Sequence, residues 1–104
     1  MAYRLIVSDF AEASFDAILE YLVESFSDKV VNAFYRETDD IKERLRTHPQ
    51  QFKKVGGKRN ARAGYLNDKV TCYFTILDDQ NVVYIYDFFD NRQNPAQLKT
   101  ILAD

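Results

Sequence analysis

Apolar residues recur at helical spacing through the first half of the chain. After a short apolar run at residues 3–7, which favours a strand, an apolar residue appears every three or four positions from Phe15 to Phe26. Carboxylates occupy the opposite side of this segment, so the pattern predicts an amphipathic helix that packs on a core. Asp9, with Glu12 three residues later, resembles a capping box and marks the predicted start of the helix.

A second helix is predicted after a short interruption at Ser27 and Asp28, which can cap its N-terminus. Its apolar stripe consists of Val30, Val31, Phe34, Ile41 and Leu45. The pattern ends near Thr47, and Pro49 stops the helix because proline disfavours helical backbone before it. The break between the two helices is so short that they are expected to form an antiparallel hairpin.

The second half of the chain changes to the two-residue period of β-strands. Apolar residues alternate with more polar ones from Lys69 to Ile76, and residues 82–89 are rich in β-branched and aromatic side chains. Turn-forming residues precede and follow the first run, and residues 61–66 favour a weaker strand ahead of it. Pro95 near the start of an apolar pattern predicts a short C-terminal helix.

The predicted fold class is α+β, with the element order β-α-α-β-β-β. An N-terminal helical hairpin packs on one face of an antiparallel sheet, and a short C-terminal helix follows. The 104 residues suffice for one hydrophobic core, so residues 1–104 are expected to form a single domain. No apolar run is long enough to cross a membrane, and Cys72 is the only cysteine, so a cytoplasmic protein without membrane contact is expected.

The charges are distributed in three blocks. Residues 1–41 carry three basic and nine acidic groups, residues 42–69 carry nine and two, and residues 70–104 carry two and five. The central excess of positive charge indicates a surface that attracts phosphates or an acidic protein partner. Lys53, Lys54, Lys58, Arg59 and Lys69 are therefore candidate nucleic-acid-binding or partner-binding residues. A merely solvated basic loop around Gly56 and Gly57 is the competing interpretation.

The chain resembles the RelE/ParE superfamily of toxins from bacterial type II toxin-antitoxin systems, also called the plasmid stabilisation family. The resemblance covers nearly the whole chain and rests on the element order together with four local segments. These are residues 18–22 of the acidic first helix, residues 45–49 at the end of the second, the basic stretch at residues 59–62, and the strand end at residues 86–95.

The resemblance implies a toxin that a cognate antitoxin neutralises, and it leaves two mechanisms open. RelE-like members cleave messenger RNA on the ribosome without a metal or cofactor, so their basic side chains act as catalysts. ParE-like members instead inhibit DNA gyrase and are not enzymes. A non-toxic relative that keeps the scaffold as a protein-interaction domain is the alternative, because fold alone does not define function.

Three residues are candidates for catalysis by analogy with the nuclease-like members: Arg62, Tyr73 and Arg92. Strand alternation would place Tyr73 with Thr71 on an open face of the sheet, with Arg62 on the neighbouring strand and Arg92 at the rim. Tyr73 would act as a base with the help of nearby cations. However, Thr71 stands where those members typically carry an arginine, and the strand end lacks a histidine, which favours a function without cleavage.

Structural rather than catalytic roles are considered for several other residues with reactive side chains. His48 is expected to lie at the C-terminus of the second helix, and Cys72 is expected to be a buried, unreactive thiol. Arg92 near Asp90 has a structural ion pair as an alternative to a functional role. The carboxylates at Asp78 and Asp79 fall in a predicted turn, so no metal site is expected.

Overall fold

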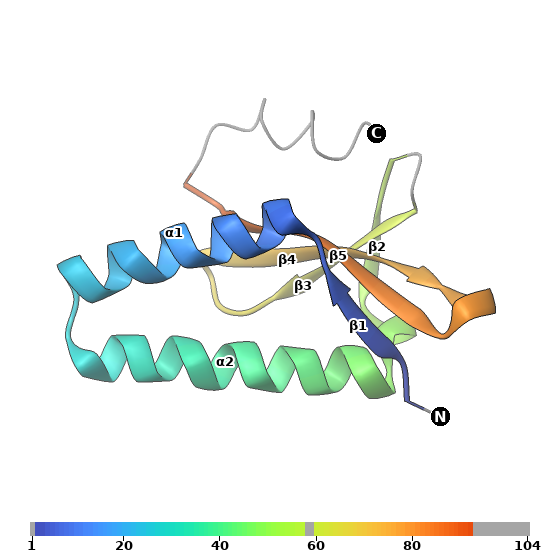
Figure 1. Ribbon diagram of the computed structural model, residues 1–104, viewed down its shortest axis with the longest axis horizontal. Coiled ribbons are helices and arrows are strands. Elements are labelled where there is room, and N and C mark those ends of the chain that lie inside the picture. The colour runs from blue at the N-terminus through green and yellow to red at the C-terminus, as the bar shows by residue number, and fades with distance from the viewer. Residues whose placement is uncertain (1, 58–59, 93–104) are drawn as a thin grey trace.

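The computed structural model describes residues 2–57 and 60–92 as two helices and a five-stranded sheet (Figure 1). The elements in chain order are β1 (Arg4–Val7), α1 (Asp9–Ser25), α2 (Asp28–Thr47), β2 (Lys53–Gly56), β3 (Ala61–Tyr65), β4 (Val70–Leu77) and β5 (Val82–Asp90). Two short 3-10 turns, Pro49–Gln51 and Asp78–Gln80, precede β2 and β5. The α+β class and the helical hairpin are confirmed. The C-terminal helix predicted from Pro95 lies outside the described residues.

The sheet is mixed, whereas the sequence predicted an antiparallel one. Its strand order is β1-β5-β4-β3-β2, and all neighbours are antiparallel except β1, which runs parallel to β5. The two strands enter the sheet from the same end, because Arg4 pairs with Val82 and Val7 with Ile85. Strand β2 was not predicted, because its two lysines and a glycine give no alternating pattern. It forms by backbone pairing with β3 at the edge of the sheet.

The caps of the two helices differ from the prediction in one detail. Helix α1 is capped by Ser8, one residue before the expected Asp9. The Ser8 hydroxyl accepts a hydrogen bond from the backbone N–H of Ala11 at 3.0 Å and donates one to the carbonyl of Tyr86 at 2.9 Å. It therefore fixes the start of the helix against β5. Helix α2 begins after Ser27, as predicted, and ends at Thr47.

The main core lies between the helical hairpin and one face of the sheet (Figure 1). Phe15 of α1 joins the layers, because its ring lies 5.1 Å from that of Phe34 on α2 and 5.2 Å from that of Phe88 on β5. The fully buried members of this core include Ile41, Leu45, Cys72, Phe74, Val83 and Ile85. The alternation predicted for β4 is confirmed on this face, with Cys72 and Phe74 at 0% exposure.

The second face of the sheet is also buried, which contradicts the predicted open surface. Thr71, Tyr73 and Thr75 are 1%, 7% and 9% exposed. Tyr73 belongs to a second cluster with Ala61, Ala63, Tyr86 and Phe89. Its residues resemble those of the main core, so the two-residue period alone could not tell a solvent-facing side from a second packed side.

A β-bulge interrupts the regular pairing of β4 with β5 next to Tyr73. Tyr73 pairs with Asp87, whereas the next residue, Phe74, pairs with Ile85, so β5 carries an extra residue at Tyr86. Beyond this point the alternation of β5 shifts by one residue. Val83 and Ile85 face the main core before the bulge, and Phe88 faces it afterwards.

Candidate functional site

Arg62, the first predicted catalytic residue, performs a structural task on the helix-facing side of the sheet. It pairs with Phe74, whose side chain lies in the main core, so both point to that side. The Arg62 guanidinium donates hydrogen bonds to the carbonyls of Phe52 at 2.7 Å and Gln50 at 3.1 Å. These bonds tie the 3-10 turn after α2 to β3.

Tyr73, the second predicted catalytic residue, lies on the opposite side of the sheet. It pairs with Ala63, the residue after Arg62, and strand neighbours point to opposite faces. Burial is the main cause that raises the pKa of the Tyr73 hydroxyl above its ordinary value. A general base must release its proton, so this shift opposes the predicted role. The expectation that Tyr73 and Arg62 share one surface is wrong.

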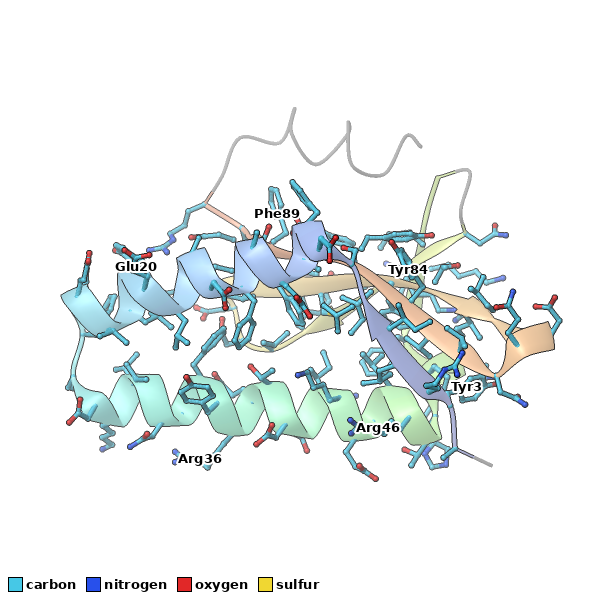
Figure 2. All side chains as sticks on the ribbon, in the orientation of Figure 1. Tyr3, Glu20, Arg36, Arg46, Tyr84 and Phe89 are labelled. Atoms are coloured by element: carbon cyan, nitrogen blue, oxygen red, sulfur yellow. The ribbon has the colours of Figure 1, made fainter. Side chains whose placement is uncertain are left out.

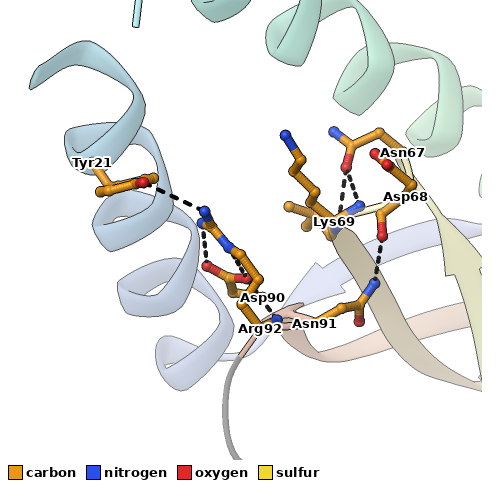
Figure 3. Close-up of polar contacts among 8 residues, drawn as sticks. Tyr21, Asn67, Asp68, Lys69, Asp90, Asn91 and Arg92 are labelled. Carbon is orange, nitrogen blue, oxygen red and sulfur yellow. Dashed lines mark hydrogen bonds and ion pairs between the residues drawn. The ribbon is translucent and has the colours of Figure 1, made fainter. Parts of the chain in front are cut away.

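Arg92 extends from the end of β5 across to helix α1 (Figure 3). Its guanidinium binds both carboxylate oxygens of Asp90, at 2.9 and 2.7 Å, and lies 4.8 Å from the centre of the Tyr21 ring. The hydrogen bonds from Arg92 lower the pKa of Asp90. The predicted ion pair is confirmed, and the arginine side chain is still 47% exposed.

Lys69 is held near Arg92 by a network of polar contacts around the turn between β3 and β4 (Figure 3). Asn67 closes this turn, because its side-chain oxygen accepts from the backbone N–H groups of Lys69 at 2.7 Å and Val70 at 3.0 Å. Asn91, the residue before Arg92, donates its backbone N–H to the carbonyl of Lys69 at 2.8 Å. Thr71 donates its hydroxyl to the Asn91 side chain at 2.9 Å, so it has a structural role where an arginine was expected.

A groove of about 250 Å³ opens beside these two cations, between the tip of the helical hairpin and the β3–β4 turn. We name it the tip groove. Its apolar lining includes Ile18, Leu22, Phe26, Val30, Phe34 and Val70. Phe26 and Val30 are 40% and 38% exposed, which is unusual for large apolar residues beside a core.

The polar rim of the tip groove contains both positive and negative groups. Lys69 and Arg92 lie on it, together with Glu37 and Asp68. Glu37 accepts a hydrogen bond from Asn67 at 3.1 Å, and the Lys69 ammonium lies 6.0 Å from the centre of the Phe26 ring. The groove thus offers an apolar floor beside a solvent-exposed cation, an arrangement that can bind an apolar side chain next to an acidic one.

The other described residues of the basic block do not line the tip groove. Lys53 and Lys54 lie on the edge strand β2 and are exposed. They pair with Ala63 and Arg62, so they point to opposite faces of the sheet. Lys58 and Arg59 lie outside the described residues. The excess of positive charge in the sequence is therefore spread over α2, β2, β3 and the β3–β4 turn.

The positions predicted for His48 and Cys72 are confirmed. His48 is the C-cap residue of α2 and is exposed, and Cys72 is fully buried with a raised pKa, mainly because burial disfavours the thiolate. Within residues 2–57 and 60–92, no cluster of three His, Cys, Asp or Glu side chains suitable for a metal ion is found. No helix in the same part of the chain is long and apolar enough to span a membrane.

Sequence reasoning missed Tyr21 and Phe26, which build the site from the side of α1. Phe26 was assigned to the buried stripe, although it ends the helix and lies partly in solvent. Its place next to the helix break was an available signal, because residues at a hairpin tip extend beyond the sheet. Tyr21 gave no signal, since its partner Arg92 is 71 residues away in the sequence.

Comparison with known proteins does not assign the chain to a family. Neither a protein-family model nor a curated protein matches it.

Proposed function

We propose that this protein is the toxin of a type II toxin-antitoxin pair and that it inhibits growth by binding its target, as gyrase inhibitors do, without cleaving RNA. The order of the strands and helices supports the toxin part of the proposal, as does the resemblance of the four sequence segments to the RelE/ParE superfamily. A cytoplasmic location belongs to the proposal, because ribosomes and gyrase are cytoplasmic.

The observation that carries the non-nuclease mechanism is the separation of Arg62 from Tyr73 by the thickness of the sheet. Metal-free RNA cleavage needs a base and a cation within hydrogen-bond reach of one phosphate group. Here the arginine binds two backbone carbonyls, and the tyrosine is 7% exposed with a raised pKa. Arg92 is bound to Asp90, which offsets its charge.

The tip groove supports the partner part of the proposal. An antitoxin segment that places an apolar side chain on Phe26 and an acidic one beside Lys69 would match both the floor and the rim. Binding of such a segment does not require Lys53 or Lys54 on the edge strand β2. The proposal therefore assigns antitoxin binding to the tip groove.

Expression of the chain alone in a bacterial host tests the function. Growth arrest with intact messages and altered plasmid supercoiling is the expected result. Early loss of translation with cleaved messages would instead establish a nuclease. The Tyr73→Phe variant sharpens the test, because it removes only the hydroxyl from a buried ring. It should remain as toxic as the wild type, and Tyr65→Phe on the exposed end of β3 serves as the matched control.

Co-purification with the product of an adjacent short reading frame tests the partner. Val30→Asp and Lys69→Glu, both on the tip groove, should weaken the complex by about tenfold or more. Arg36→Glu makes the same change of charge as Lys69→Glu, and Figure 2 shows Arg36 on the side of α2 that faces away from α1. A complex that Arg36→Glu weakens as strongly would place the interface elsewhere.

A non-toxic interaction domain is the second candidate function, favoured by the bond from Thr71 to Asn91. This bond gives the strand position a structural role in place of the expected arginine. Unimpaired growth on expression alone, combined with a stable complex through the tip groove, would support this alternative.

A further inference from the structure

The second face of the sheet is buried although, in the described part of the chain, no helix belongs to its cluster. The members of this cluster all lie on the neighbouring strands β3, β4 and β5: Ala61, Ala63, Tyr73, Tyr84, Tyr86 and Phe89. Both helices contribute instead to the main core on the other face. Figure 2 shows Phe89 on the side that faces away from α2. Side chains on one face of a sheet point the same way, so their contacts with each other are lateral and do not cover their outer surfaces.

The exposure of the tyrosines shows that the middle of this face is covered. Tyr73, Tyr86 and Phe89 are 7%, 6% and 3% exposed. Tyr65 belongs to the same face, because it pairs with Thr71, yet it is 63% exposed. A bare sheet face would leave other large rings open as Tyr65 is. A cover therefore lies over the middle of the face and leaves the corner at Tyr65 free.

The extent of this cover can be read along β5. Beyond Tyr86 the face opens into a hollow of about 470 Å³, lined by Thr75, Leu77, Tyr84 and Tyr86. Phe89 and Tyr86 are three positions apart, which is about 10 Å along a strand. The cover is therefore short, and it lies next to the end of β5, where the described residues stop at Arg92.

Residues 93–104 fit this cover by their position, length and sequence. They follow directly on Arg92, and 12 residues span about 18 Å even at the short rise of a helix. Leu98, Ile101 and Leu102 provide apolar side chains, and the segment has only one basic and one acidic residue. The cluster on the second face is likewise uncharged. The other residues outside the described ranges, 1 and 58–59, are too few to cover three rings.

We propose that residues 93–104 dock on the second face of the sheet and lay their apolar side chains against Tyr73, Tyr86 and Phe89. The domain then has a second core, which its own C-terminal segment closes. No ligand reaches Tyr73 while this segment is in place. The tip groove is lined by Phe34 and other residues of the main core, so it stays available to a partner.

Nitration of tyrosines in the full chain, read residue by residue by mass spectrometry, tests the proposal. Leu98→Asp and Ile101→Asp each place a charge among the apolar residues of the segment. Thr100→Asp is the matched control, because it adds the same charge at a polar position of the same segment. Tyr65 is the internal reference for an exposed ring. A thiol reagent on Cys72, in the main core, reports whether each variant is folded.

In the wild type, Tyr73 and Tyr86 should react at least about tenfold more slowly than Tyr65. Leu98→Asp and Ile101→Asp should raise both rates at least about fivefold, because an unpaired charge is unfavourable in an apolar contact and displaces the segment. Thr100→Asp should change them less than about twofold. Should Cys72 become reactive in the aspartate variants, Leu98→Ala and Ile101→Ala replace them.

Three results would overturn the proposal. The first is that Tyr73 and Tyr86 stay as unreactive in the Leu98 and Ile101 variants as in the wild type. The second is an equal rise of both rates in Thr100→Asp. The third is a wild-type dimer, seen by sedimentation, whose dilution to the monomer makes both tyrosines reactive. That result would make a second copy of this chain the cover of the face.

Discussion

Asp87 is predicted to reduce the stability of the protein at neutral pH, and Asp87→Asn tests this directly. The carboxylate lies at the β-bulge and is 2% exposed. Burial raises its pKa from 3.8 to about 6, although the nearby Ser14 hydroxyl and Phe88 backbone N–H act to lower it. The titratable groups nearest to it on β4 are the thiol of Cys72 and the hydroxyl of Tyr73, both with raised pKa values.

The sign and size of the effect follow from linkage. Between pH 4 and 6 the folded protein keeps a proton on Asp87 that the unfolded chain has released. The free energy of unfolding contributed by this group is therefore highest below about pH 4 and falls as the pH rises through 6. A shift of about two units corresponds to at most ~3 kcal/mol, and solvent screening reduces the expected loss to roughly 1–3 kcal/mol.

Urea unfolding followed by circular dichroism at pH 4.5 and pH 7.5 measures the effect in both proteins. The wild type should lose about 1–2 kcal/mol more than Asp87→Asn between the two pH values, because part of the full effect lies below pH 4.5. Groups elsewhere titrate alike in both proteins, so they cancel in this difference, as does any constant cost of the asparagine amide. Equal pH dependence in the two proteins, or a wild type that gains relative stability as the pH rises, would refute the reasoning.

Four further predictions concern stability and reactivity. Ser8→Ala should cost about 1–2 kcal/mol in urea unfolding, because it removes the cap of α1 and the bond to Tyr86; Ser27→Ala, whose side chain makes no capping bond, should cost less. Gly64→Ala should cost about 1–3 kcal/mol in the same assay, since a Cβ would lie 2.7 Å from Ile41 and 3.0 Å from Phe52, both buried; an unchanged midpoint would contradict this packing. Arg62→Met should lower the thermal midpoint by more than Lys54→Met, because only Arg62 is seen to donate to Phe52 and Gln50; equal shifts would argue against its structural role. Cys72 should react with a thiol reagent at least about a hundredfold faster in urea than in the folded state; fast native labelling would show that the thiol is accessible.

Much of the fold followed from local pattern. The apolar spacing of α1 and α2 and the helix break at Ser27 were sufficient to predict the hairpin. The alternation of β4 identified the face that packs under it. The candidate site was predicted only in part. Arg92 and Lys69 do lie at one groove, but Arg62 and Tyr73 were assigned to one surface although they lie on opposite faces.

By itself, the sequence determined the two helices, the strands other than β2 and the gathering of positive charge in residues 42–69, because periodicity and composition depend on neighbouring residues. Only the tertiary structure decided which side chains meet. The parallel pairing of β1 with β5, the bulge at Tyr86 and the contact of Arg92 with Tyr21 join residues more than ten positions apart or change the register of one strand against another. Such contacts depend on how packed layers fit together, and the burial of both faces of β4 removed the open surface that alternation had indicated.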